Sequence, residues 1–249
     1  MLEIHVAVAK IGHQNALESG NTLEMIERPS GGFSLVLVDG RGSGRGAKTL
    51  SNLVATRAIS LLKDGARDGA VARAVHDYLY TYRMGQVSAT LNILSVDFVS
   101  GDILMSRNNP APFFVINTQG LHTYNDPALP IGLHAMTRPV ISGLPIEAYT
   151  YVVLFTEGLL HAGERFGEDM ELSNYLAGWP AAEGRRSEEL TEDLLQRALE
   201  LERGQLAQDI GIVTLAVLPA NRHDNVRRMR VAVPFEQVKR IYLSENQIV

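Results

Sequence analysis

An apolar segment that leads directly into an acidic residue and a glycine-rich turn is the feature of this sequence that most restricts its fold. The segment runs from Phe33 to Val38, the acid is Asp39, and glycine occupies every second position from Gly40 to Gly46. Such an apolar run predicts a buried β-strand. Glycine allows a backbone to approach a ligand closely, so a carboxylate beside this turn predicts a site for a divalent cation or a phosphate.

Three interpretations of this turn are open. A phosphate-binding loop is disfavoured, because the turn lacks the Lys-Ser/Thr ending of a P-loop and the glycine spacing of dinucleotide-binding folds. A metal site would use the Asp39 carboxylate and main-chain carbonyls, which are the hard oxygen ligands that Mg²⁺, Mn²⁺ and Ca²⁺ prefer. An ordinary strand-to-helix turn, in which Asp39 caps an orphan N–H group, is the third.

Composition limits the kinds of partner and of metal site. The chain has 249 residues, of which 45% are apolar, and no cysteine. One large domain is expected, and a metal site would need carboxylate, imidazole or carbonyl ligands. A net charge of −5 gives no general attraction to nucleic acid. We find no membrane-spanning run and no signal peptide, so we expect a cytoplasmic protein without nucleic acid or membrane as a partner.

Hydrophobic periodicity predicts an α+β protein with hairpin-rich strands and helices inserted in pairs. Helices are expected from Ser43 to Lys63, from Asp68 to Tyr82 and, with interruptions, between Gly167 and Leu201. The predicted strands are Glu3 to Lys10, Leu23 to Arg28, Phe33 to Asp39, Ser88 to Asp97, Asp102 to Ser106, Pro112 to Ile116, Tyr151 to Phe155 and Ile210 to Leu218, with a weaker one from Arg228 to Val233.

Acidic residues stand at the ends of three predicted strands. Asp39 and Glu157 each follow an apolar strand and precede a glycine, and Asp209 opens the last strong strand. Strand ends of a sheet core can converge on one cleft, and convergent carboxylates repel one another unless a cation holds them together. The pattern is typical of a two-metal hydrolase site.

A series of motifs along nearly the whole chain resembles the PPM-type metal-dependent protein serine/threonine phosphatases, in particular their bacterial SpoIIE-like branch. The glycine turn is similar to the family's Asp-Gly-x-Gly-x-Gly, and the other motifs follow in the family's order. They are Ser19-Gly20-Asn21, Val38-Asp39-Gly40-Arg41-Gly42-Ser43-Gly44, Ser88-Ala89-Thr90-Leu91, Asn109-Pro110-Ala111-Pro112, Leu129-Pro130-Ile131-Gly132, Phe155-Thr156-Glu157-Gly158-Leu159 and Gln208-Asp209-Ile210-Gly211.

The resemblance implies a four-layer α-β-β-α sandwich of two antiparallel sheets flanked by helices. Residues 1–220 would form the phosphatase domain, and residues 221–249 a C-terminal extension packed on it. The implied activity is hydrolysis of phosphoserine or phosphothreonine on a bacterial signalling protein, such as an anti-sigma-factor antagonist. Two Mn²⁺ or Mg²⁺ ions would bridge and activate a water molecule, and no residue would become phosphorylated.

The resemblance also implies a role for individual residues. Asp39 would bridge both ions and the Gly40 carbonyl would bind one of them. Glu157 and the Gln208-Asp209 pair would complete the second metal site, and Asn21 would stand near the first. Apart from the resemblance, the guanidinium groups of Arg41 and Arg45 could bind the substrate phosphate, or could be solvated residues at the start of a helix. Each of these residues also has an ordinary structural interpretation, such as Glu157 capping a helix that begins at Gly158.

Three of these positions depart from the family pattern, which usually has Asp where this chain has Asn21, Glu157 and Gln208. Asn loses the charge, Glu reaches further by one methylene, and Gln is a poor ligand. Asp209 could replace Gln208 only through a bulge, because neighbouring side chains of a strand point to opposite faces. Occupancy by one ion, weak binding, and a catalytically impaired pseudophosphatase that binds a phosphoprotein are therefore open alternatives.

Overall fold

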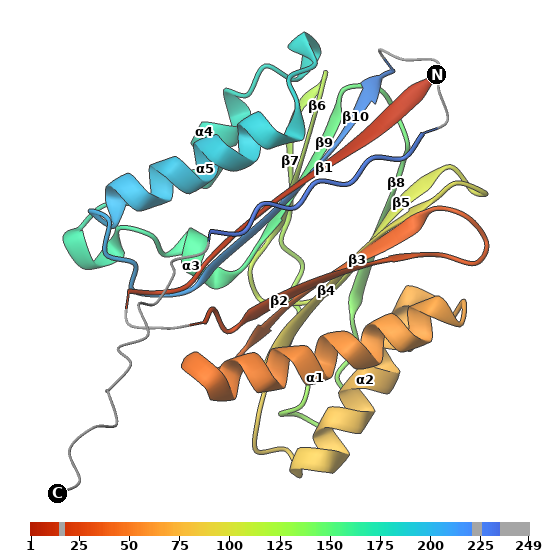
Figure 1. Cartoon of the computed structure of the whole chain (residues 1–249), viewed down its shortest axis with the longest axis vertical. Coiled ribbons are helices and arrows are strands. Elements are labelled where there is room, and N and C mark those ends of the chain that lie inside the picture. The colour runs from red at the N-terminus through yellow and green to blue at the C-terminus, as the bar shows by residue number, and fades with distance from the viewer. Residues whose placement is uncertain (15–17, 221–225, 235–249) are drawn as a thin grey trace, which may run out of the picture.

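Two antiparallel sheets face each other in the structure, a computed structural model that describes residues 1–14, 18–220 and 226–234. Within these residues each sheet has five strands (Figure 1). The order in sheet A is β1 (Leu2–Ile11), β10 (Ile210–Pro219), β9 (Thr150–Phe155), β6 (Phe113–Asn117) and β7 (Gly120–Tyr124). The order in sheet B is β2 (Asn21–Glu27), β3 (Phe33–Gly40), β4 (Ala89–Asp97), β5 (Asp102–Asn108) and β8 (Val140–Pro145).

Helices cover the outer face of each sheet (Figure 1). The long pair α1 (Gly44–Lys63) and α2 (Asp68–Arg83) lies on sheet B. Sheet A carries α3 (Glu157–Leu160), α4 (Leu172–Ala177) and α5 (Ser187–Leu201), with 3₁₀ turns at Glu164–Phe166 and Ala181–Glu183. The predicted four-layer α-β-β-α sandwich is confirmed.

Three apolar clusters hold the layers together, and the alternation of side chains along each strand explains them. In β4, Leu91 and Ile93 pack under the helices, whereas Leu94 and Val96 pack between the sheets. β9 is buried along its whole length because helices cover one face and sheet B the other. This accounts for its continuous apolar sequence.

Gly40 permits the close join between β3 and α1. A Cβ atom at this position would lie 2.2 Å from the main-chain oxygen of Ala47, so no larger residue fits. Gly42 and Gly44, with φ of 108° and 63°, turn the chain between the strand and the helix. The glycine turn therefore places the first turn of α1 against the end of β3.

The structure differs from the sequence-based expectation at two kinds of strand. β7 and β8 were not expected; both are short edge strands, and in β8 exposed positions alternate with half-buried ones. The expected strand from Arg228 to Val233 is wrong, because the described residues 226–234 have no regular secondary structure and their side chains are exposed. Alternating arginine and apolar residues suit a strand only where a neighbour supplies ladder hydrogen bonds. Arg227 instead contacts Glu27 of β2, at 2.5 Å.

No helix among the described residues is both long and apolar enough to cross a membrane.

Arg107 is the largest fully buried side chain and organises the turn after β5. Its guanidinium donates hydrogen bonds to the main-chain oxygens of Asn109 (2.6 Å), Ala111 (3.0 Å) and Asp126. Burial lowers the pKa of Arg107, while the Asp126 charge raises it. The side chain therefore depends on these carbonyl acceptors for compensation.

We predict that Arg107→Met lowers the free energy of unfolding by about 2–4 kcal/mol, because three carbonyls lose their donor in the interior. Urea unfolding followed by circular dichroism measures the change. Arg73→Met on the exposed face of α2 is the matched control, with an expected change within about 0.5 kcal/mol. Equal stability of the two variants would contradict a structural role for Arg107.

Candidate metal centre

Asn21 and Asp39 are direct neighbours at one end of sheet B. They are partners in the antiparallel register of β2 and β3. The Asn21 amide is oriented by its hydrogen bonds, and its Nδ2 donates to Asp39 Oδ1 at 2.8 Å. The residue that replaces the family's acid thus holds the Asp39 carboxylate through a neutral donor.

The same amide joins sheet B to sheet A. Its Oδ1 accepts hydrogen bonds from Thr156 Oγ1 (3.1 Å) and from the main-chain N–H of Gly211 (3.3 Å). Gly211 N–H also donates to Thr156 Oγ1, at 2.9 Å. Asn21 has no exposed surface, so these bonds form inside the protein, where an unpaired amide would be costly. The ends of β2, β3, β9 and β10 are thereby held at one point.

Asp209 uses both carboxylate oxygens to hold the connection between β1 and β2. Oδ1 accepts from the main-chain N–H of His13 (2.7 Å) and lies 2.9 Å from its ring Nδ1, and Oδ2 accepts from the main-chain N–H of Gly20. Only 8% of its side chain is exposed. Most of the ligand capacity of this carboxylate is therefore already used by protein donors.

Asp39 experiences the charges of both other acids. Burial, and to a smaller extent the negative charges of Asp209 and Glu157, raise its pKa from 3.8 to about 7. Of the three strand-end acids predicted from the sequence, Asp39 and Asp209 line the same cavity, and the charge of Glu157 also acts on Asp39. A divalent cation beside Asp39 would reverse the effect and keep the carboxylate ionised at neutral pH.

Glycines let the acid-bearing segments approach one another. A Cβ at Gly158 would lie 2.2 Å from the main-chain oxygen of Asp209, and one at Gly20 would lie 3.0 Å from Asp209 Oδ2. Together with Gly40, these positions bring main chains into direct contact around the acids. The glycine that follows each of Asp39 and Glu157 is thus required by packing.

A small polar cavity of about 170 Å³ opens at this end of the sandwich. Asp39 lies in its wall, and Gln208 stands exposed at its rim. Its lining residues are His13, Asp39, Gly42, Ser43, Ala207, Gln208 and Asp209. Arg41 is exposed and does not line the cavity. Its main-chain N–H donates to the main-chain oxygen of Ser88 at 3.2 Å.

This centre offers a hard cation fewer ligand groups than the family pattern implies. In the described part of the chain, no group of three His, Cys, Asp or Glu side chains is arranged to hold a metal ion. Among the described residues, Asp39 accepts one side-chain hydrogen bond, from Asn21, and Glu157 accepts none, whereas Asp209 is committed to His13 and Gly20. Two carboxylates, with carbonyl or amide oxygens, suit one Mg²⁺ or Mn²⁺ ion that retains several waters.

Helix capping does not explain the two acids. The N-cap of α1 is Ser43 and that of α3 is Thr156, and neither makes a side-chain capping bond. Glu157 is the first residue of α3, so the expected helix start at Gly158 is wrong by one residue. Asp39 lies in β3 and accepts from Asn21, so the capping interpretation of this residue is wrong too.

Sequence reasoning missed His13 and Thr156 as parts of this centre. His13 stands in no metal-binding motif, yet it lines the cavity and contacts Asp209. Its contact partner is 196 residues away in the sequence, and no local pattern signals such a pairing. Thr156 stood inside a recognised motif, but its bridging role depends on how the two sheets face each other.

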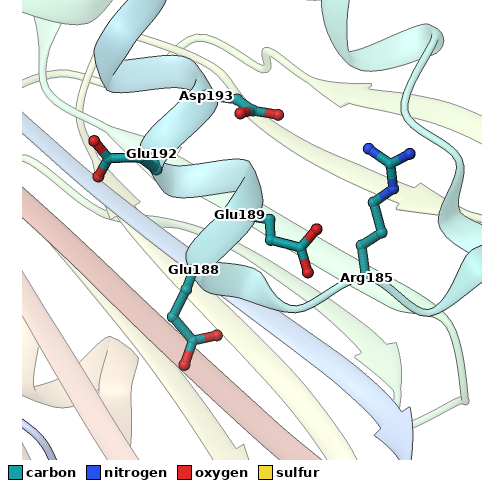
Figure 2. Close-up of a pocket in the computed structure, with 5 residues that line it drawn as sticks. All are labelled: Arg185, Glu188, Glu189, Glu192 and Asp193. Carbon is teal, nitrogen blue, oxygen red and sulfur yellow. The ribbon is translucent and has the colours of Figure 1, made fainter.

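A larger cavity, of about 510 Å³, lies over the first turns of α5 and is lined by Arg185, Glu188, Glu189, Glu192 and Asp193 (Figure 2). Glu189 is committed to capping α5 through the main-chain N–H of Arg186, at 3.2 Å. Arg185 pairs with Glu183 and stacks on Trp179. These groups form an acidic helix surface, and none of the strand-end residues lies among them. The smaller cavity beside Asp39 is therefore the candidate site.

We predict that Asp209→Ala lowers the free energy of unfolding by about 2–4 kcal/mol in the presence of a chelator, because the N–H groups of His13 and Gly20 lose their acceptor. Asp209→Asn, which keeps one oxygen, should fall between the wild type and Asp209→Ala. Urea unfolding measures both, with the exposed Asp77→Ala as control. If Asp209→Ala costs no more than this control, the carboxylate does not anchor the connection.

The raised pKa of Asp39 predicts a pH-dependent cost in the metal-free protein. The folded state keeps the Asp39 proton up to about pH 7, whereas the unfolded state loses it near pH 3.8, so this residue destabilises the fold increasingly as pH rises through that interval. The gain in melting temperature from Asp39→Asn should therefore be larger at pH 8 than at pH 5, by about 3 °C or more. Differential scanning fluorimetry with chelator measures it.

The exposed Asp77→Asn should show no such difference between the two pH values. A gain for Asp39→Asn that is equal at pH 5 and pH 8 would contradict the raised pKa.

The sequence matches the family Stage II sporulation protein E (SpoIIE) over residues 29–218. No curated protein matches the chain. Among solved structures, the PP2C phosphatase domain with a fragment of the regulatory domain of SpoIIE from Bacillus subtilis is 17% identical with a TM-score of 0.74, over 86% of this chain and 63% of that chain. The chain thus spans less than two thirds of that structure's length.

Two further structures share the fold. The RsbU and RsbW domains of Rv1364c from Mycobacterium tuberculosis are 20% identical with a TM-score of 0.70, over 86% of this chain and 60% of that chain. RsbX in complex with magnesium is 12% identical with a TM-score of 0.64, over 87% of this chain and 100% of that chain. Because the family match covers most of the chain, the chain belongs to the SpoIIE family, and it shares the fold of PP2C-type phosphatase domains.

Proposed function

We propose that the protein is a metal-dependent protein serine/threonine phosphatase. Its substrate would be phosphoserine or phosphothreonine on a bacterial signalling protein, such as an anti-sigma-factor antagonist. The observation that carries the proposal is that Asp39 and Asp209 line one polar cavity, where burial and the charges of Asp209 and Glu157 raise the pKa of Asp39 to about 7. A cluster of acids beside a polar cavity at the end of a PPM-type sandwich is suited to a cation and a phosphate ester.

Asp39, the Gly40 carbonyl and Glu157 would hold Mn²⁺ or Mg²⁺, with Gln208 at the rim and Asn21 and Asp209 as supporting residues. When bound, the ion supplies Lewis-acid polarisation of the phosphate and lowers the pKa of a coordinated water. Asn21 keeps Asp39 in place by donating to Oδ1. Asp209 keeps His13 at the cavity wall.

Arg41 is the candidate phosphate-binding residue. Its side chain is exposed next to the cavity residues Gly42 and Ser43, and its main chain is fixed by the hydrogen bond to Ser88. A guanidinium can bind two phosphate oxygens at once, and an exposed one can move to do so.

Residues 1–220 would form the catalytic domain with 221–249 as an extension, and a cytoplasmic location completes the proposal.

A pseudophosphatase that binds a phosphoprotein without hydrolysing it is the second candidate. The observation that favours it is the reduced donor set: Asn21 is a neutral amide, Gln208 is exposed and neutral, and Asp209 is occupied by His13 and Gly20. Such a centre would bind metal ions weakly or would hold only one ion. The fold alone is compatible with both candidates.

The direct test is release of phosphate from a phosphoserine peptide in the presence of Mn²⁺. We predict that Asp39→Ala lowers kcat/KM by about 100-fold or more, because it removes the central carboxylate. The exposed Asp77→Ala is the control and should retain wild-type activity. Hydrolysis at the same rate by wild type and Asp39→Ala would exclude a metal phosphatase centred on this residue.

Calorimetric titration with Mn²⁺ separates the two candidates. The phosphatase predicts at least one bound ion that disappears in Asp39→Ala. Absence of binding at millimolar Mn²⁺, together with absence of turnover, supports the pseudophosphatase.

A further inference from the structure

Two lysine side chains converge on a single main-chain oxygen beside the candidate metal centre. Lys48 Nζ donates to the oxygen of Asn21 at 2.9 Å and to Thr22 Oγ1 at 3.0 Å. Lys10 Nζ donates to the same Asn21 oxygen at 3.4 Å. Lys10 comes from β1 of sheet A and Lys48 from α1 on sheet B, so the fold brings them together from opposite sides of the sandwich.

Neither ammonium group forms an ion pair with an acid of the described residues. Among the described residues, every ion pair with an acid uses arginine or histidine, and none uses lysine. Burial and the neighbouring Lys10 lower the pKa of Lys48, and the smaller effects of Glu18 and Glu24 raise it. Two like charges that share one acceptor therefore remain available to an anion.

The position of the pair is fixed by the face of β1. Lys10 lies on the same face as Ile4 and Val6, which pack between the sheets, so its side chain extends toward sheet B. Lys10 remains exposed and Lys48 half-buried. An anion from solvent can therefore reach the Lys10 ammonium group, and the half-buried Lys48 ammonium group shares its acceptor.

Asn21 connects this pair to the candidate metal centre. Its main-chain oxygen accepts from both lysines, and its side chain donates to Asp39 Oδ1. Because Asn21 contacts both, the lysine ammonium groups and the Asp39 carboxylate are on the order of 10 Å apart. An extended peptide covers this distance in about three residues, at ~3.3 Å per residue. A peptide bound at Asp39 would thus bring a side chain about three positions away to the lysines.

We propose that Lys10 and Lys48 form a subsite for an acidic side chain of the phosphoprotein substrate, about three residues from the phosphorylated one. The inference rests on the proposed phosphatase function. Two adjacent ammonium groups match a carboxylate, which can accept a hydrogen bond at each oxygen. On a protein of net charge −5, such a pair would select acidic substrates locally rather than through the overall field.

The test uses two series of phosphoserine peptides, with Glu or Gln placed three residues before or after the phosphoserine. For the wild type, kcat/KM should favour the Glu peptide of one series about tenfold over its Gln counterpart. The double variant Lys10→Met/Lys48→Met should reduce this ratio to about one. Lys63→Met, at the exposed end of α1, is the control for the loss of a lysine elsewhere on the surface and should keep the wild-type ratio.

Substitution by arginine separates charge from packing, because Lys10→Arg/Lys48→Arg retains two cations and should retain the preference. Melting temperatures of all variants identify any that fail to fold. A ratio that is the same in wild type and in the double methionine variant would overturn the subsite.

Failure of the phosphatase proposal would be recognised separately, since no peptide would then be hydrolysed by the wild type. Fluorescence anisotropy with the same labelled peptides and the Asp39→Asn protein would still measure the Glu preference and its dependence on the two lysines. Equal binding of Glu and Gln peptides would overturn the subsite independently of turnover.

Discussion

The side-chain amide of Asn21 joins the two sheets at the place where the strand-end acids meet. It donates to Asp39 on one side and accepts from Thr156 and Gly211 on the other. The sandwich has a separate apolar core under each helical layer and a third between the sheets, but this polar contact fixes the relative position of the strand ends. The position of Asp39 beside the cavity depends on this contact, and the main-chain oxygen of Asn21 accepts from the lysine pair.

At the end of the sandwich that holds Asp39, negative charges and neutralising contacts oppose one another. Asp39 lies near two other negative charges, yet Asp209 is held by main-chain N–H groups and by His13. The neutral Asn21 replaces what would be a further negative charge. The centre thus carries less charge than a full set of acids would give, which fits a site that holds fewer or more weakly bound cations.

Local patterns predicted most of the fold, because the central strands and the long helices have clear periodicity. The edge strands β7 and β8 were missed since β7 is mostly exposed and β8 contains glycine and proline. The strand expected from Arg228 to Val233 had the right alternation but no partner in the described structure. For the site, motif order located Asp39, Glu157 and Asp209, whereas the contacts of Asp209 with His13 and Gly20 follow from tertiary packing that no sequence window contains.

The neutrality of the Asn21 amide has a consequence for how the molecule is assembled. If acidic groups stood at this contact between the sheets, their repulsion would oppose its formation until a metal ion bound, and folding would depend on the ion. The amide closes the contact with ordinary hydrogen bonds, so the polypeptide can reach its final shape during metal starvation. Under the proposed function, the supply of manganese or magnesium would then control turnover and not folding.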